Sequence, residues 1–325
     1  MKFSVLVPCL LLAYGAQAQQ QTVQKTIAAT LAEITTFERQ AWVRDSSNHR
    51  VLRSQTEETF VAKGKFYTTV EAELTAINKK SLSFDDQINL ELINHLVLDE
   101  VAAYHYKTYF NPLKTDVGFH AHLAGFGGMI INDAREAEQY LLLLMDVPRY
   151  MDENMQLMRQ GIARGITQPK EVLTGYETSY TQHLVSTAEE SIFWKPFRRK
   201  PASIAEPEWD VLQANARLVI RRDVVGSYQK LKWFFDEEYL PHAQPTLGAA
   251  GLPNGRAYYE DRVRHFTTTT LTSEQVYQVG LTEVARIRRE MEQVICDVKF
   301  KGDFKEFIAF YATTRSFTRK QQMNY

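Results

Sequence analysis

The sequence predicts an all-α fold made of many helices, on three observations. Apolar residues recur at steps of three and four, which places them on one face of a helix. Residues that favour helix starts, Ser83 and Thr272 among them, stand in front of such periodic segments. Glycine and proline gather between the segments, as in residues 111–131 and 193–207. We therefore expect a chain that is almost entirely helical, with irregular connectors.

The first half of the chain predicts two long helices separated by a polar loop. Residues 23–43 form the first, and residues 44–56 read as the loop. Ser83 caps a second long helix, with Asp85 and Asp86 in its first turn, where carboxylates favour the positive helix end. The predicted buried stripe of this helix is Leu92, Ile93, Leu96, Val97, Val101 and Tyr104.

The middle of the chain alternates irregular and helical segments. Residues 111–131 are rich in glycine and lack a helical period. A helix is expected from Asn132 to about Met145, and the next begins around Pro148 and ends near Gly165. Another helix is expected to start at Thr167-Gln168-Pro169.

The last third predicts a connector and three further helices. Residues 193–207 contain three prolines and read as the connector. Residues 208–239 form the longest predicted helix, which Pro241 stops. Thr272 with Gln275 is a capping box at the start of the next helix. Asp303, with Glu306 three positions later, has the same pattern before a short helix over residues 304–311, and the chain then becomes polar.

The first eighteen residues read as an export signal. Lys2 supplies the positive start, residues 3–14 the apolar stretch and Ala16-Gln17-Ala18 the cleavage site. The apolar stretch is too short to span a bilayer as a helix. Cleavage after Ala18 predicts a periplasmic or secreted protein. A lipoprotein leader at Cys9 is disfavoured, because Pro8 stands where a small residue is expected.

Composition excludes several classes of partner. Without Lys2 the 38 basic residues become 37, against 39 acidic ones, so the net charge is about −2. We expect no nucleic-acid partner and no membrane span. Cys296 is the one cysteine after the leader, so no intramolecular disulfide is possible. We expect Cys296 on the inner face of a helix, as a small apolar residue.

The histidines exclude a helical zinc-peptidase site within this sequence. Such a site needs two imidazoles four residues apart with a carboxylate beside the first. The eight histidines are His49, His95, His105, His120, His122, His183, His242 and His265. No two of them have that spacing, so no catalytic residue, metal ligand or cofactor is predicted.

The one close pair, His120 and His122, admits three interpretations. The two side chains share a face only where the backbone is extended. They could be half of a metal site, a polar pair on a loop, or part of the wall of a substrate cleft. A cleft wall is favoured over a metal site, because neighbouring glycines let a ligand approach the backbone and no further ligands stand nearby. Tyr258 and Tyr259, behind the Pro253-Asn254-Gly255 turn, are the other candidate cleft residues.

Other catalytic patterns are absent from the sequence. Adjacent carboxylates on a helix point in different directions, so Asp85-Asp86, Glu189-Glu190 and Glu237-Glu238 form no acid/base pair. No Gly-x-Ser-x-Gly motif is present, and Gly125-Phe126-Gly127-Gly128 lacks the lysine of a phosphate loop.

Four segments, in fixed order, resemble one known family. They are residues 83–92, residues 158–169, Glu237 to Pro241, and residues 252–295 with their Tyr258-Tyr259 pair, threonine run and following helix. This order is similar to the bacterial domain-of-unknown-function family 885. Complete members of that family look like helical zinc metallopeptidases that carry a His-Glu-x-x-His motif in their C-terminal half. The resemblance covers about Phe84 to Tyr311, roughly the first half of a complete member.

The resemblance implies a helical zinc-peptidase-like architecture in which this part shapes and covers the cleft, and zinc only in a complete member. We therefore predict three parts: a signal over residues 1–18, a helical N-terminal region over 19–315, and a polar tail over 316–325 that reads as an interruption. Premature termination, a frameshift or a split gene would each explain that tail. The leading hypothesis is an exported, non-catalytic, hydrolase-like portion of a peptidase-like protein. The alternatives are a self-sufficient periplasmic peptide-binding protein, or half of a split peptidase whose partner is the missing C-terminal half.

Overall fold

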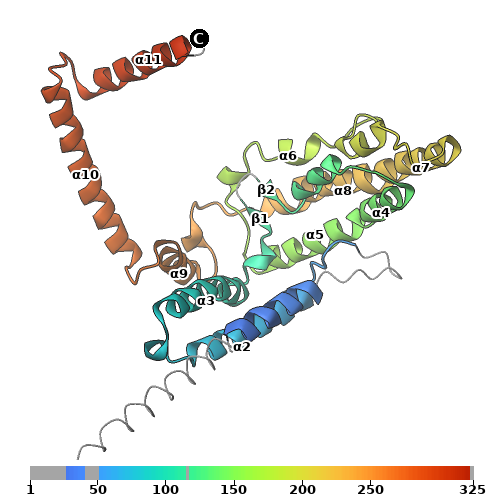
Figure 1. The fold of residues 1–325 in the computed structure, drawn as a ribbon, viewed down its shortest axis with the longest axis horizontal. Coiled ribbons are helices and arrows are strands. Elements are labelled where there is room, and N and C mark those ends of the chain that lie inside the picture. The colour runs from blue at the N-terminus through green and yellow to red at the C-terminus, as the bar shows by residue number, and fades with distance from the viewer. Residues whose placement is uncertain (1–26, 41–50, 115–116, 323–325) are drawn as a thin grey trace, which may run out of the picture. The chain divides into compact units, whose positions relative to one another are not determined.

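A computed structural model describes residues 27–40, 51–114 and 117–322, which are almost entirely helical (Figure 1). Residues 27–40 form a helix, which lies within the first predicted one. The α-helices that follow are α2 (Glu57–Thr75), α3 (Phe84–His105), α4 (Ala134–Met145), α5 (Val147–Ala163), α6 (Thr178–Thr181), α7 (Glu206–Val219), α8 (Gly226–Phe234), α9 (Gly255–Thr267), α10 (Ser273–Asp297) and α11 (Phe304–Gln322). The predicted all-α fold is confirmed.

Short helical turns and one small ladder join these helices. The 3₁₀ turns are η1 (Lys79–Ser81), η2 (Thr108–Phe110), η3 (His122–Gly128), η4 (Lys170–Leu173), η5 (Ile192–Arg198), η8 (Leu240–His242) and η9 (Ala249–Gly251), and the π-helical segments are η6 (Ile220–Val225) and η7 (Phe235–Tyr239). The strands β1 (Leu113–Lys114) and β2 (Val117–Gly118) pair antiparallel, with Leu113 opposite Gly118. This ladder lies in the glycine-rich segment that was predicted to be irregular.

The chain divides into two compact units, Met1–Tyr258 and Tyr259–Tyr325. The predicted leader, residues 23–26 and 41–43 of the first predicted helix, and residues 44–50 of the predicted polar loop lie outside the described residues. No helix in the described part of the chain is long and apolar enough to cross a membrane.

In the first unit, α2 and α3 form an antiparallel helical pair. Ser83 caps α3 as predicted, since its hydroxyl accepts from the Asp86 backbone N–H. The helices approach closely at Gly64, where an added Cβ would lie 2.1 Å from Cγ of Tyr104. The core of the pair includes Tyr67, Val70, Leu74, Leu90, Ile93 and Val97.

The predicted buried stripe of α3 is wrong at two positions. Leu92 and Leu96 are exposed, whereas Ile93 and Val97 are buried. The helix carries apolar residues on two faces and packs one of them on α2, so periodicity alone could not show which face is buried.

The larger core of the first unit lies among α4, α5, α7 and α8. Its fully buried members include Tyr140, Leu144, Met155, Phe193, Phe197, Tyr228, Leu231 and Phe234. The predicted longest helix begins two residues early, at Glu206, and runs to Tyr239 through α7, η6, α8 and η7 without a break. Two π-helical segments therefore interrupt its regular period, which the sequence pattern did not predict.

Gly161 and Gly165 both have a structural role at the end of α5. Gly165 has a φ of +69°, its N–H bonds to the Ile162 carbonyl at 3.1 Å, and the Ile166 N–H bonds to the Gly161 carbonyl at 2.8 Å. These bonds form a Schellman motif. At Gly161 an added Cβ would lie 2.6 Å from the Phe110 carbonyl oxygen, so the site has no room for a side chain.

Two predicted connections differ from the structure. The helix expected from Thr167 is only the turn η4, because the backbones of Gln168 and Lys170 bond to Gln244 instead of continuing a helix. The connector over residues 193–207 includes most of η5, which buries Phe193, Trp194 and Phe197.

The second unit contains α10 and α11. Thr272 and Gln275 form the predicted capping box. Before α11, the carboxylates of Asp303 and Glu306 each accept a hydrogen bond of 2.8 Å from the backbone N–H of the other residue. α11 runs to Gln322, well past the predicted end at residue 311, since no glycine or proline follows to stop it. Cys296 is exposed, contrary to expectation, because the surface of α10 is largely uncovered.

Candidate functional site: the His120 loop, the tyrosine pair and the surface of α10

His120 lies between β2 and η3 and is completely buried. Its Nε2 lies 2.8 Å from Oγ of Ser179, and its backbone carbonyl accepts a hydrogen bond of 2.8 Å from the Tyr228 hydroxyl. Ser179 donates its own hydroxyl proton to the Tyr176 carbonyl at 2.6 Å. Since a serine has one proton to donate, His120 must donate from Nε2, which leaves Nδ1 as an acceptor.

Aromatic rings surround the His120 imidazole. Ring centroids of Phe119, Tyr176, Tyr180 and Phe235 lie between 5.4 and 6.5 Å from it. Burial, and then His183 and His122, lower the pKa of His120 to about 4. Near neutral pH the imidazole is therefore uncharged, and it acts as a hydrogen-bonding core residue.

Gly118 is required by this cluster. A Cβ added there would lie 2.4 Å from the Tyr176 hydroxyl and 3.1 Å from Nδ1 of His120. At Gly125 and Gly128 an added Cβ would meet nothing within 4 Å. Internal packing thus explains Gly118, and also Gly127 of η3, where an added Cβ would lie 2.6 Å from the Ile192 carbonyl oxygen. Only Gly125 and Gly128 leave open space beside the backbone of the described loop.

The two predicted cleft histidines point to different surroundings. His120 is enclosed, whereas His122 starts η3 and is exposed. In residues 27–40, 51–114 and 117–322, no group of three or more His, Cys, Asp or Glu side chains could hold a metal ion.

The tyrosine pair is also divided. The Tyr258 ring lies edge-on to that of Tyr106 at 5.3 Å, and the Tyr106 hydroxyl donates to the Ala257 carbonyl at 3.3 Å. Tyr259 is 53% exposed. One tyrosine therefore packs, and the next presents its ring to solvent.

Two ionic sites were not predicted from the sequence. Arg159 on α5 makes two bonds, of 2.6 and 2.7 Å, to the carboxylate of Glu238 in η7, and these bonds lower the pKa of Glu238. The buried Asp146 accepts from the backbone N–H groups of Val51 and Leu52 at 2.7 Å each. Both carboxylates are separated in sequence from their partners by dozens of residues, so spacing could not reveal them.

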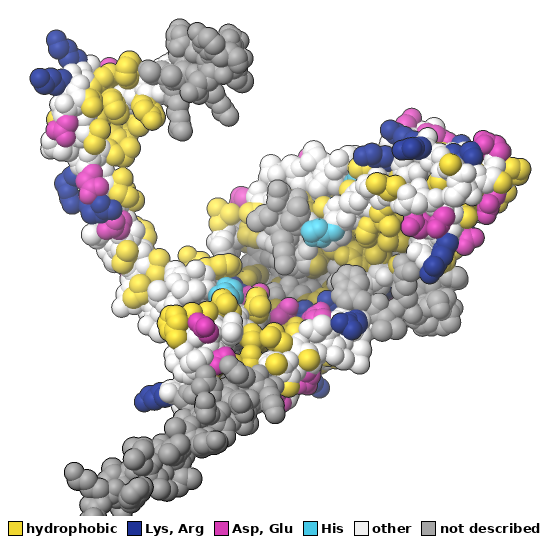
Figure 2. Space-filling model, in the orientation of Figure 1, with side chains coloured by type: hydrophobic (Ala, Val, Ile, Leu, Met, Phe, Trp, Pro, Cys, Tyr) yellow, Lys and Arg dark blue, Asp and Glu magenta, His cyan; other side chains and the backbone are white. Residues whose placement is uncertain are grey.

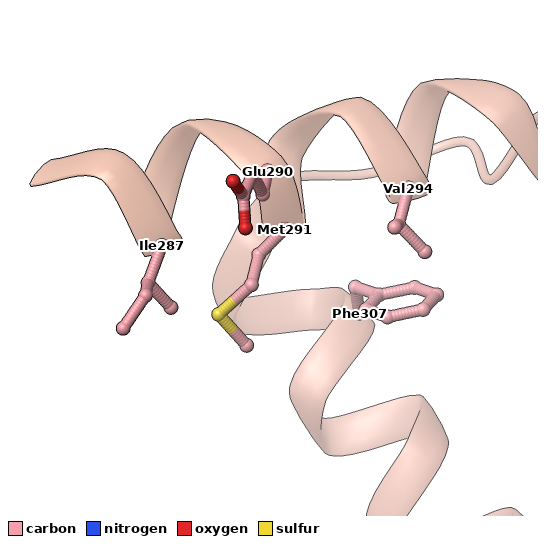
Figure 3. Close-up of a pocket in the computed structure, with 5 residues that line it drawn as sticks. All are labelled: Ile287, Glu290, Met291, Val294 and Phe307. Atoms are coloured by element: carbon pink, nitrogen blue, oxygen red, sulfur yellow. The ribbon is translucent and has the colours of Figure 1, made fainter. Parts of the chain in front are cut away.

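The surface of α10 is the least expected feature. Its apolar side chains remain largely exposed, and hydrophobic residues gather along one side of the helix while charged ones follow the other (Figure 2). Beside them a groove of about 210 Å³ lies between α10 and α11 (Figure 3). Ile287, Met291 and Val294 line it from α10 together with the charged Glu290, and Phe307 lines it from α11.

Comparison with known proteins identifies a family and a similar solved structure. Residues 40–324 match the family described as "Bacterial protein of unknown function (DUF885)". The structure is similar to the crystal structure of a "putative lipoprotein" from Colwellia psychrerythraea, with a TM-score of 0.63 and 17% sequence identity. The similarity covers 88% of this chain and 51% of that one, so the chain spans about half the length of its solved relative. No match was found among curated proteins.

Proposed function

Since the chain belongs to the DUF885 family of bacterial proteins, we propose that it is the exported, cleft-shaping N-terminal portion of a zinc-metallopeptidase-like protein. By itself this portion does not hydrolyse peptides. One observation carries this proposal: no two of its histidines stand four apart, so the paired imidazoles of a His-Glu-x-x-His site are missing from these 325 residues.

The four candidate cleft residues take different parts in this proposal. His122 in the first unit and Tyr259 in the second are exposed, so each would contact a ligand from its own unit. His120 and Tyr258 would support the backbone behind them, since one is buried and the other packs on Tyr106. Zinc would be bound by residues outside this sequence.

Export is supported by the leader pattern of residues 1–18 and by the description of the solved relative as a lipoprotein. Mass spectrometry of the chain recovered from the bacterial envelope tests it. We expect a mature protein that begins at Gln19. A chain that retains residues 1–18 in the cytoplasm would contradict export, and a lipid attached to Cys9 would assign the other class of leader.

The test of non-catalysis is direct. Residues 19–325 are purified, loaded with zinc, dialysed, and examined by metal analysis and by cleavage of a mixed peptide library. We expect no stoichiometric zinc and no turnover. Stoichiometric zinc together with peptide cleavage, both abolished by a chelator, would overturn the proposal.

A self-sufficient periplasmic peptide-binding protein is the second candidate. The extensive buried core among α4, α5, α7 and α8 favours it, because a core of this kind can fold without further polypeptide. It predicts a compact monomer, a single cooperative thermal transition and saturable peptide binding. An aggregating product without such a transition would count against it.

A further inference from the structure

An uncovered apolar surface occupies one side of the second unit. We define the α10–α11 surface as Tyr277, Val284, Ile287, Met291 and Val294 of α10 with Phe307 of α11. The five α10 side chains are between 37% and 67% exposed, with Met291 lowest and Val284 highest. A contiguous exposed apolar patch on a helix marks an interaction site.

The spacing of this surface is that of a helix–helix contact. Tyr277, Val284 and Met291 stand seven residues apart, and Ile287 and Val294 fall between and after them at steps of three and four. An apolar repeat of this kind forms a seam against another helix.

The charged side chains of α10 pair with one another along the helix, and Glu290 is the one that also lines the groove. Arg286 binds Glu283 at 2.8 Å and Glu290 at 2.6 Å, and Arg288 binds Glu292 at 2.6 Å. These pairs join residues three or four apart on the same helix, so they need no partner to neutralise them. The apolar side of α10 is thus the side whose residues remain exposed.

The groove shows what shape would fit. Phe307 stands opposite Met291 and Val294 and forms the second wall, so the end of the seam is already partly covered by α11 (Figure 3). A second copy of α10 could not run along the whole seam past Phe307. A single helix could occupy the groove by inserting its apolar side chains between α10 and α11, as the ridges of one helix fit the grooves of another.

We propose that the α10–α11 surface docks an amphipathic helix from polypeptide outside these 325 residues, the counterpart of the half of the Colwellia psychrerythraea protein that this chain does not cover. Residues 40–324 match the family, so α10 and α11 belong to its fold. The solved relative contains about as much polypeptide again as the matched half. The inference rests on the proposed function and adds the place where the zinc-bearing half attaches.

The experiment co-expresses tagged residues 19–325 with the polypeptide of the source bacterium that matches the other half of the relative and carries His-Glu-x-x-His. We expect a 1:1 complex by size-exclusion chromatography with light scattering. The double variant Val284→Glu with Ile287→Glu should reduce recovery of the partner at least tenfold, since it leaves charges buried at the centre of the contact.

Arg289→Glu is the matched control. It changes the net charge by the same amount as the double variant and lies on the opposite side of α10, so partner recovery should be unchanged. Circular dichroism checks that all variants keep the helix content of the parent, as expected for exposed positions.

Several results would overturn the docking proposal. They are a genome without such a polypeptide, a chain that stays unbound in its presence, a complex that survives the double variant, and self-association that the double variant removes. Failure of docking with an inactive chain leaves the proposed function standing. Zinc binding with turnover by the chain alone defeats the proposed function, whatever the docking result.

Discussion

Residues 27–258 and residues 259–322 use the same kind of amphipathic helix with opposite results. In α8 of the first unit, Tyr228, Leu231 and Phe234 are fully buried. In α10 of the second, Val284 is 67% exposed and Leu281 is 49% exposed. Apolar residues recur with a helical period in both α8 and α10. The period therefore shows that each helix has an apolar face. Whether that face finds a partner depends on what else the fold provides.

The largest expected difference between the regions is in the cost of truncating leucine. Leu231→Ala should lower the free energy of unfolding by about 2–5 kcal/mol, because it removes a fully buried side chain and leaves a cavity. Leu281→Ala should change it by less than about 0.5 kcal/mol, because Leu281 is 49% exposed. Urea unfolding of both variants checks this. Equal losses would mean that the two regions are packed alike.

The pH dependence of stability sharpens the account of the first region. Since folding lowers the pKa of His120 from 6.5 to about 4, the unfolded chain binds more protons in that interval. The free energy of unfolding keeps its full contribution from the neutral His120 above pH 6.5. It declines by up to about 3 kcal/mol as the pH falls toward 4. His120→Gln keeps a side-chain donor for Ser179 and should reduce this slope, leaving the part contributed by His183, whose pKa burial also lowers. An unchanged slope in urea titrations at stepped pH would show that His120 is not the group responsible.

A smaller contrast concerns two tyrosine hydroxyls. Tyr228→Phe should cost about 1–3 kcal/mol, because the buried His120 carbonyl loses the hydroxyl that bonds it at 2.8 Å. Tyr277→Phe should have almost no effect, because Tyr277 is 59% exposed. Thermal unfolding of the two variants measures the difference. A Tyr228→Phe protein as stable as the parent would contradict the described bond.

The smallest effect is expected at the ion pair of α5 and η7. Arg159 lowers the pKa of Glu238, so this pair stabilises the fold above pH 4.5 and loses its effect as the pH falls through the folded-state pKa. Glu238→Gln should cost less than about 1 kcal/mol near neutral pH, since both side chains are partly exposed. Once the pH has fallen below the folded-state pKa of Glu238, the variant and the parent should unfold at the same denaturant concentration. A gap that shows no decrease as the pH is lowered would assign the effect to packing.

The all-α fold and several helix ends could be predicted because their causes are local. Ser83, Thr272 and Asp303 cap helices through bonds to residues three positions away, which sequence spacing shows directly. The helix α2 was not singled out, and α11 extends well past its predicted end. The exposed Leu92 and Leu96 show the limit, because α3 has two apolar faces and only contact with α2 selects one.

The candidate site could be predicted only in part. Neighbouring positions suggested that His120 and His122 act together, but the turn after β2 encloses one and exposes the other. The Asp146 contacts to residues 51 and 52 and the Arg159–Glu238 pair depend on tertiary packing. Their roles are invisible without the fold. Whether the exposed residues contact a peptide remains a prediction.

Amide hydrogen exchange of the purified chain tests most directly whether the second region is the open side of a larger assembly. We predict that α10 exchanges many times faster than α8 in the chain alone, because few packing contacts oppose its opening. Exchange of α10 should slow when the second polypeptide is bound. Protection of α10 equal to that of α8, with no partner present, would contradict the account.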